Sequence, residues 1–250
     1  MSELVLVPTP VGNLEDITLR ALRMLKEAEC IYAEDTRVTR KLLSHFEISQ
    51  QVFPYHAHNE HRTLELAVDK IKQNKLTVLV SDAGTPAISD PGFLLVRACV
   101  EAGIKVSCLP GPTALIPALV GSGLPCDRFV FEGFLPHKKG RQTKLQQLAQ
   151  EDKTVVLYES PHRLEKCLAQ IAEFFGASRK VCVVREISKI YEEFKRGEVQ
   201  DVLAYYEKNP PKGEIVIIIE GKPEKEPGDQ PGEKIKKSKK YRKELNDDDN

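Results

Sequence analysis

The 250-residue chain lacks several patterns that mark well-known classes of protein. No apolar run approaches the roughly 18 residues of a membrane span. The start of the chain leads directly into a strand-like segment, without the layout of a signal peptide. The six cysteines are scattered, mostly inside apolar segments, and none forms a C-x-x-C pair. This usage is typical of reduced thiols in a cytoplasmic protein, and it favours neither disulfides nor a zinc site.

Three further motifs are missing. Neither G-x-G-x-x-G nor G-x-x-x-x-G-K-[ST] occurs, so a dinucleotide or a nucleoside triphosphate is a less favoured ligand, whereas a smaller nucleoside stays open. Without G-x-S-x-G, the nucleophile elbow of hydrolases is unsupported. His56, His58 and His61 do not have zinc-finger spacing, and no Cys or carboxylate partner is dictated for them, so we expect no metal site.

The charge is balanced overall but unevenly distributed. The chain has 37 Lys and Arg against 37 Asp and Glu, yet residues 234–243 hold seven cations and no acid. Such a run is usually a solvated tail; the alternative is an arm that follows the phosphates of RNA, with Lys236 and Lys237 as candidate contacts. Because Pro, Gly and charge replace apolar periodicity, we expect residues 222–250 to be disordered.

The rest of the chain alternates strand-like and helical segments, which predicts an α/β protein with two α/β domains. We expect a domain at 1–115 around a mainly parallel sheet and a second at 116–221 around a mixed sheet, because residues 191–196 read as an added antiparallel strand. Asp16 is expected to cap the first helix. The predicted strands are 4–7, 30–33, 76–80, 105–109, 128–131, 154–158, 180–185, 192–196 and 214–220, and the predicted helices are 17–29, 37–46, 62–72, 93–102, 141–150, 163–175 and 199–207.

The longest strand-to-helix connection is the most informative segment. Residues 81–92 read Ser-Asp-Ala-Gly-Thr-Pro-Ala-Ile-Ser-Asp-Pro-Gly, whereas such connections usually have about 2–6 residues. Four other loops follow strand ends, at 8–14, 34–37, 110–114 and 159–163. Ligands of α/β proteins bind beyond the carboxyl ends of the strands, so we expect the five loops to surround a binding site.

With these loops assembled, the chain resembles the tetrapyrrole methylase superfamily, and within it the family of ribosomal RNA small subunit methyltransferase I. The resemblance covers residues 9–163 and continues more loosely to about residue 221. Ala-Glu-Asp-Thr-Arg at 33–37 and the 81–92 segment mark the ribosomal RNA branch rather than the porphyrin branch. The other matching segments are Thr9-Pro-Val-Gly-Asn-Leu-Glu-Asp-Ile-Thr18, Pro110-Gly-Pro-Thr-Ala114, Ser122-Gly-Leu-Pro125, Phe131-Glu-Gly-Phe-Leu-Pro136 and Tyr158-Glu-Ser-Pro-His-Arg163.

The resemblance implies S-adenosylmethionine in a cleft between the two domains. It implies methyl transfer to the ribose 2′-oxygen of a cytidine in small-subunit (16S) ribosomal RNA, and a homodimer. The residues that it assigns to the cofactor are Pro8, Gly12, Asp82, Ala83, Gly84, Thr85, Pro86, Pro110, Gly111, Thr113 and Ala114 in the first domain, and Phe131, Gly133, Tyr158, Glu159, Ser160, Gly213, Glu214 and Ile215 in the second.

The resemblance also implies which residues act on the substrate. Asp35 is expected to accept the proton of the 2′-hydroxyl, with Glu34 in reserve, because related enzymes present an acidic residue from this loop. Arg37 and Arg163 are expected to pair with RNA phosphates. Two alternatives stay open: a porphyrin-type C-methyltransferase on the same fold, and a ribosome-assembly factor that keeps the cofactor without turnover.

Overall fold

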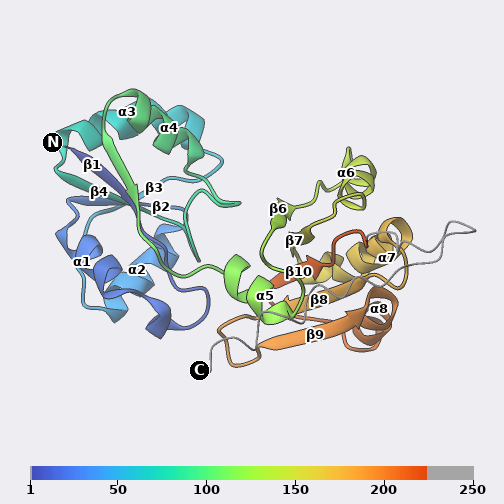
Figure 1. Ribbon diagram of the computed structural model, residues 1–250. Helices are drawn as coiled ribbons and strands as arrows, with labels where there is room; N and C mark the ends of the chain where they lie inside the picture. The colour runs from blue at the N-terminus through green and yellow to red at the C-terminus, as the bar shows by residue number, and fades with distance from the viewer. Residues whose placement is uncertain (1, 224–250) are drawn as a thin grey trace, which may run out of the picture.

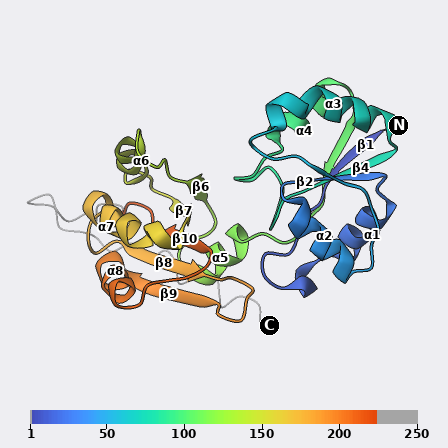
Figure 2. The same ribbon diagram turned by 180° about the vertical axis from the view of Figure 1, so that it is seen from behind.

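The structure, a computed structural model, describes residues 2–223. Residues 224–250, which include Lys236 and Lys237, therefore lie outside the described residues. The chain forms two lobes, each built around one sheet, and helix α5 (Leu115–Ser122) lies in the segment that joins them (Figures 1 and 2). The prediction of two α/β units, one mainly parallel and one mixed, is confirmed.

The first lobe holds a five-stranded sheet whose strands all run parallel, in the order β3-β2-β4-β1-β5. Helices α1 and α2 cover one face of this sheet, and α3 and α4 cover the other (Figure 1). The loops that follow the strands therefore open at one edge of the sheet. The elements are β1 (Glu3–Leu6), α1 (Leu19–Glu27), β2 (Cys30–Ala33), α2 (Thr36–His45), β3 (Val52–Pro54), α3 (Glu60–Gln73), β4 (Leu76–Val80), α4 (Phe93–Glu101) and β5 (Lys105–Cys108).

The second lobe holds a mixed sheet in the order β6-β7-β10-β8-β9. Only β6 and β7 pair in parallel, and the other neighbours are antiparallel. Helices α6, α7 and α8 pack on one face and α5 on the other. The elements are β6 (Phe129–Phe134), α6 (Arg141–Leu148), β7 (Thr154–Glu159), α7 (Leu164–Phe175), β8 (Lys180–Arg185), β9 (Glu193–Glu198), α8 (Val199–Lys208) and β10 (Ile215–Ile219).

Three local features differ from the sequence prediction. The expectation that Asp16 caps the first helix is wrong: the Thr18 hydroxyl accepts from the Ala21 amide at 3.0 Å, and Asp16 accepts from Ser188 of the second lobe. Strand β3 was not predicted, because three residues are too few to show a period. Helix α5 was not predicted either, because the Gly and Pro residues around it read as a linker.

The described residues contain no helix long and apolar enough to cross a membrane. All six cysteines are free thiols; four are buried, and Cys108 and Cys126 are exposed. Burial raises the pKa of the buried thiols, for example that of Cys99 to about 11. These thiols are therefore protonated, apolar parts of the core.

Candidate functional site

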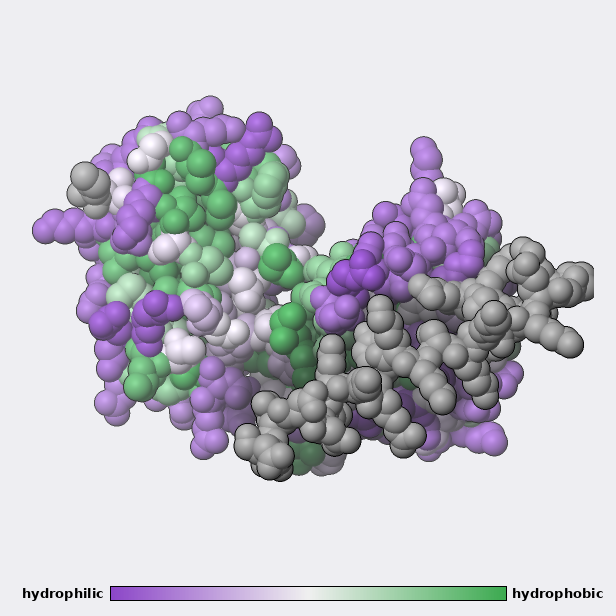
Figure 3. Space-filling model, viewed as in Figure 1, coloured by the Kyte–Doolittle hydropathy of each residue, from purple (hydrophilic) through white to green (hydrophobic). Residues whose placement is uncertain are grey.

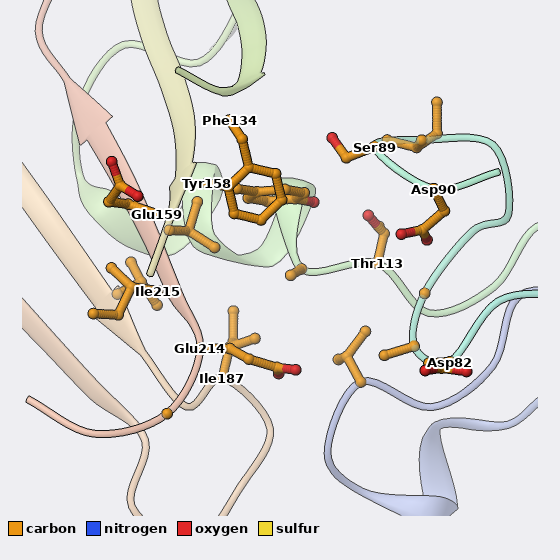
Figure 4. A pocket seen from close by; sticks show the side chains of 18 of the residues that line it. Asp82, Ser89, Asp90, Thr113, Phe134, Tyr158, Glu159, Ile187, Glu214 and Ile215 are labelled. Carbon is orange, nitrogen blue, oxygen red and sulfur yellow. The ribbon is translucent and has the colours of Figure 1, made fainter. Parts of the chain in front are cut away.

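The edge of the first sheet where its loops open faces the second lobe across a notch (Figure 3). A cavity of about 420 Å³ lies there, and both lobes line it (Figure 4). Cavities of roughly 300–1,000 Å³ are usual for small-molecule ligands. The lining residues are Val11, Glu34, Asp82, Ala83, Gly84, Thr85, Ile88, Ser89, Asp90, Thr113 and Ala114 from the first part of the chain, and Phe134, Tyr158, Glu159, Ser160, Pro161, Val184, Ile187, Gly213, Glu214, Ile215 and Val216 from the second.

The long loop at 81–92 forms the wall on the side of the first lobe. Its start is fixed by two backbone hydrogen bonds between Thr9 and Gly84, of 2.9 and 2.8 Å, and by the Thr9 hydroxyl, which donates to the Ser81 carbonyl at 3.0 Å. Gly84 has a φ of +80°, a conformation that side chains with a Cβ rarely adopt. The backbone of the loop therefore has a fixed conformation where it borders the cavity.

Strand ends of the second lobe form the opposite wall, which is mainly apolar. Val184, the last residue but one of β8, and Ile215, the first residue of β10, lie on neighbouring antiparallel strands at this edge of the sheet. The ring of Tyr158 lies edge-on between Phe131 at 5.1 Å and Phe134 at 5.6 Å, measured between ring centroids. This wall offers flat apolar surface, and Phe134, which is 52% exposed, leaves part of it open.

A buried ion network supports this second wall. The Glu159 carboxylate accepts from the guanidinium of Arg141 at 3.2 Å, from that of Arg163 at 2.7 Å and from the Ser160 amide at 2.8 Å. Arg141 also donates to Gln170 at 2.7 Å. Because Glu159 is 3% exposed and fully paired, its side chain positions the loop that follows β7.

Three carboxylates face the cavity from the first lobe: Glu34 after β2, and Asp82 and Asp90 in the long loop. Burial is the main cause that raises the pKa of each, and the neighbouring carboxylates raise it further. For Asp90 the pKa rises to about 7. Among residues 2–223, no group of three or more Asp, Glu, His or Cys side chains is arranged to hold a metal ion. Clustered carboxylates with raised pKa values in a cleft are typical of sites that bind a cation or transfer a proton.

Asp35 and Arg37, expected in catalysis, lie beside the cavity and not in its lining. The two oxygens of Asp35 accept from Nε and Nη2 of Arg37 at 3.0 and 2.6 Å, and Asp35 also caps α2 by accepting from the Arg37 amide. These hydrogen bonds lower the pKa of Asp35 to about 2. A carboxylate held this firmly in its ionised form is a weak proton acceptor. The assignment of Asp35 as the base stays a prediction that this geometry does not favour.

Most of the residues expected at the cofactor line the cavity, and the others pack behind it. A Cβ on Gly12 would collide with Ile187 and Lys189 of the second lobe, one on Gly133 with the Ser89 hydroxyl, and one on Gly111 with Pro8. These glycines permit close approach between segments, twice between the lobes. The predicted residues outside the lining are Pro8, Gly12, Pro86, Pro110, Gly111, Phe131 and Gly133.

Arg163, expected at an RNA phosphate, is occupied inside the second lobe. Besides Glu159, its guanidinium contacts His137 at 2.8 Å, and its side chain is 25% exposed. The Arg37 side chain, by contrast, is 83% exposed next to the mouth of the cavity. Of the two arginines, Arg37 is the one placed to meet a polyanion.

Sequence reasoning missed several lining residues. Ser89 and Asp90 lie in the long loop that was singled out, so their position was available as a signal, whereas Phe134 stood in a quoted motif as an aromatic with no assigned role. Val184 in β8 and Ile187 in the turn beyond it carried no signal, because an apolar residue in or next to a strand has the same pattern as a core residue. The missed residues of the lining are Val11, Ile88, Ser89, Asp90, Phe134, Pro161, Val184, Ile187 and Val216.

Comparison with known proteins agrees with this geometry. Residues 3–203 match the model of the family described as Tetrapyrrole (Corrin/Porphyrin) Methylases. A protein of Synechocystis sp. named ribosomal RNA small subunit methyltransferase I is 51% identical over 222 residues, which are 88% of this chain and 80% of the relative. One of the same name from Thermotoga maritima is 43% identical over 89% of this chain and all of the relative.

Among solved structures, a uroporphyrin-III C-methyl transferase from Thermus thermophilus, complexed with S-adenosylhomocysteine, aligns with a TM-score of 0.62 and 20% identity, covering 87% of this chain and 97% of its own. At this identity the match speaks for the fold alone. The family match over residues 3–203 and the relatives at 51% and 43% identity confirm the resemblance read from the loops at 9–163.

Proposed function

We propose that this chain, which belongs to the family of tetrapyrrole (corrin/porphyrin) methylases, transfers a methyl group from S-adenosylmethionine to small-subunit ribosomal RNA, at the ribose 2′-oxygen of a cytidine. The observation that carries the proposal is the 51% identity, over 88% of the chain, to a relative named for that RNA. The cavity at the strand ends supports it, since a methyltransferase needs its donor and its acceptor side by side.

The cavity fits S-adenosylmethionine in size and in chemistry. Glu34, Asp82 and Asp90 suit a ligand that carries a sulfonium and an ammonium group, because a bound cation favours the ionised form of nearby carboxylates. Val184 and Ile215 offer an apolar surface for a purine. When bound, this cofactor supplies an already activated methyl group, so the protein has to hold the acceptor hydroxyl in line and take its proton.

In this proposal each wall of the cavity binds one end of the cofactor. We assign the methionine end to the loop residues Asp82, Ala83, Gly84 and Thr85 together with Thr113 and Ala114. The adenosine end goes to the strand ends, with Tyr158, Glu159, Ser160, Gly213, Glu214 and Ile215. Gly213 supports this division, because it borders the cavity with a φ of +88°, which favours glycine, and any side chain there would displace the adjacent Glu186 carboxylate.

The lining also separates two kinds of acceptor. A porphyrin-type acceptor carries several carboxylates and needs cations around it, yet no lysine or arginine is among the described residues that line the cavity. An RNA ribose needs a neutral entrance with cations farther out on the phosphates, which agrees with the exposed Arg37. We therefore favour RNA over a tetrapyrrole.

We place the protein in the cytoplasm, where its six free thiols stay reduced. We also propose a homodimer, which sedimentation analysis of the purified protein would test. Its partner is the RNA of the small ribosomal subunit, free or in an assembled particle.

The test is methyl transfer from methyl-labelled S-adenosylmethionine to small-subunit particles that lack the modification, with uroporphyrinogen as the competing acceptor. We expect label on one cytidine, mapped by resistance of the adjacent bond to alkaline cleavage. Label in the porphyrinogen would point to a C-methyltransferase. Cofactor binding without transfer to either acceptor would point to an assembly factor.

A further inference from the structure

Asp90 is one of the acidic residues that line the cavity, and its surroundings differ from those of Asp35. In Figure 4 its carboxylate points into the cavity toward Thr113, and the hydroxyl of Tyr158 points to the same region from the second lobe. The Asp90 charge is close enough to raise the pKa of that tyrosine. Asp90 thus faces the space between the lobes, whereas Asp35 faces Arg37.

The backbone that carries Asp90 is strained. Ala87 and Ser89 have φ values of +71° and +62°, in the left-handed region that residues with a Cβ rarely adopt. Packing holds the strain in place: Ser89 lies against Gly133 of the second lobe, and Gly92, which directly precedes helix α4 with a φ of +138°, lies against Ala87. Strain that surrounding structure maintains is typical of segments that aim a functional group.

The surroundings keep Asp90 able to exchange a proton near neutral pH. Burial is the largest cause of its raised pKa of about 7, and the charge of Glu34 adds to it. Asp82 raises it slightly and a hydrogen bond from Ser81 opposes the shift. His56 lies near Glu34 and favours the charged form of that neighbour. A proton acceptor works best when its pKa lies near the operating pH.

We propose that Asp90 is the catalytic residue that accepts the proton of the ribose 2′-hydroxyl, a role that rests on the methyl transfer proposed above. The 2′-oxygen forms a bond to the methyl carbon while the carbon–sulfur bond breaks. The electron pair of the broken bond stays on sulfur, which becomes neutral, and the hydroxyl proton passes to a carboxylate oxygen of Asp90. Solvent takes up that proton when the product leaves. Glu34 and Asp82 shape the charge around this step, and Tyr158 and Thr113 flank the acceptor.

The experiment is single-turnover transfer of labelled methyl to unmodified small-subunit particles between pH 5.5 and 9, with cofactor affinity measured by calorimetry. The variants are Asp90→Asn, Asp90→Glu and Asp35→Asn, with Asp69→Asn as a control in which an exposed aspartate of α3 loses its charge. We expect the wild-type rate to rise with pH to a plateau. The midpoint should lie below about 7, because a bound sulfonium favours the ionised carboxylate. Asp90→Asn should lose about 10²–10⁴-fold in rate together with the rising limb, and should still bind the cofactor. Asp90→Glu should recover part of the rate, and Asp69→Asn should behave as wild type.

Three results would overturn the assignment. Asp90→Asn could turn over within a few-fold of wild type, or it could be slow with the rising limb intact, which would make Asp90 a positioning residue only. Loss of turnover in Asp35→Asn, with Asp90→Asn active, would return the role to Asp35. If the wild type itself transfers nothing to RNA, the proposed function fails, and that result is distinct from all three.

Discussion

The two walls of the cavity are built by opposite means. The wall of the first lobe is irregular, partly strained backbone with exposed or half-buried acids, held by packing and by hydrogen bonds between Thr9 and Gly84. The wall of the second lobe is the end of a regular sheet, apolar on its surface and fixed from behind by the buried Glu159 network. The contrast indicates a division of labour, in which one wall supplies charge for chemistry and the other supplies a rigid surface for binding.

The largest effect should come from removing the support of the second wall. Glu159→Ala leaves the guanidinium of Arg141, 5% exposed, without its carboxylate. Breaking a buried pair in this way costs about 3–5 kcal/mol in the free energy of unfolding, which chemical denaturation would measure. Glu165→Ala on the exposed side of α7 is the matched control and should change little. An equal, small loss in both would mean that the wall does not depend on the network.

A smaller loss is expected from the backbone of the first wall. Gly84→Val forces a β-branched residue to a φ of +80°, at a cost of about 1–3 kcal/mol, and places its side chain at the cavity. Cofactor binding should become undetectable by calorimetry. Gly103→Val is the matched control, since Gly103 has a φ of +71° with open space around it. It should lose similar stability yet bind normally; normal binding by Gly84→Val would remove this loop from the site.

The counterpart on the second wall is Gly213→Ala. Its methyl group would displace the Glu186 carboxylate, which accepts from the Glu214 amide at 2.9 Å and from Lys189 at 2.8 Å. We expect cofactor affinity to fall about 5–20-fold, corresponding to about 1–2 kcal/mol, with the pH dependence of turnover unchanged. Gly176→Ala, also at positive φ but in open space, is the control. A changed pH profile would show that the two walls are not separate in function.

The smallest effect concerns the stability of the folded protein as pH changes. The pKa of Asp90 is about 7 in the folded protein against 3.8 as the ordinary value, so the folded state holds its proton more tightly. The contribution of this group to stability is therefore complete below about pH 4 and is lost as the pH rises toward 7. Asp90→Asn should be more stable than wild type at pH 8, on the order of 1 kcal/mol after allowance for solvent screening. Thermal melts at pH 4 and 8 measure this, and a difference that does not grow with pH would contradict the raised pKa.

The sequence predicted the wall made of loops better than the wall made of strands. Loop residues such as Asp82 and Gly84 stand out because turn chemistry and charge are unusual after a buried strand. Val184 and Ile215 do not stand out in the same way, since an apolar residue at a strand end has the same pattern whether it packs inside or faces a cavity. Ile215 was found only through the resemblance.

The roles of the acidic residues could not be predicted from the sequence and required the structure. Asp35 and Asp90 are both loop aspartates in the sequence. Only the structure shows that Arg37 occupies both oxygens of the first, while the second is half-buried beside Glu34. Likewise, the sequence presents Arg163 as a free cation, whereas in the structure it forms an ion pair with Glu159. Pairing between side chains distant in the chain leaves no local pattern to read.

The contact between Ser89 and Gly133 joins these two walls at one point. The side chain next to Asp90 lies against the backbone of the opposite lobe, where a Cβ at position 133 would come within 2.8 Å of the Ser89 hydroxyl and force it to shift. The distance between the lobes and the direction of the Asp90 side chain therefore depend on each other. Widening the cleft for a larger acceptor would therefore also move the group that takes the proton. A change of acceptor would then change reactivity as well.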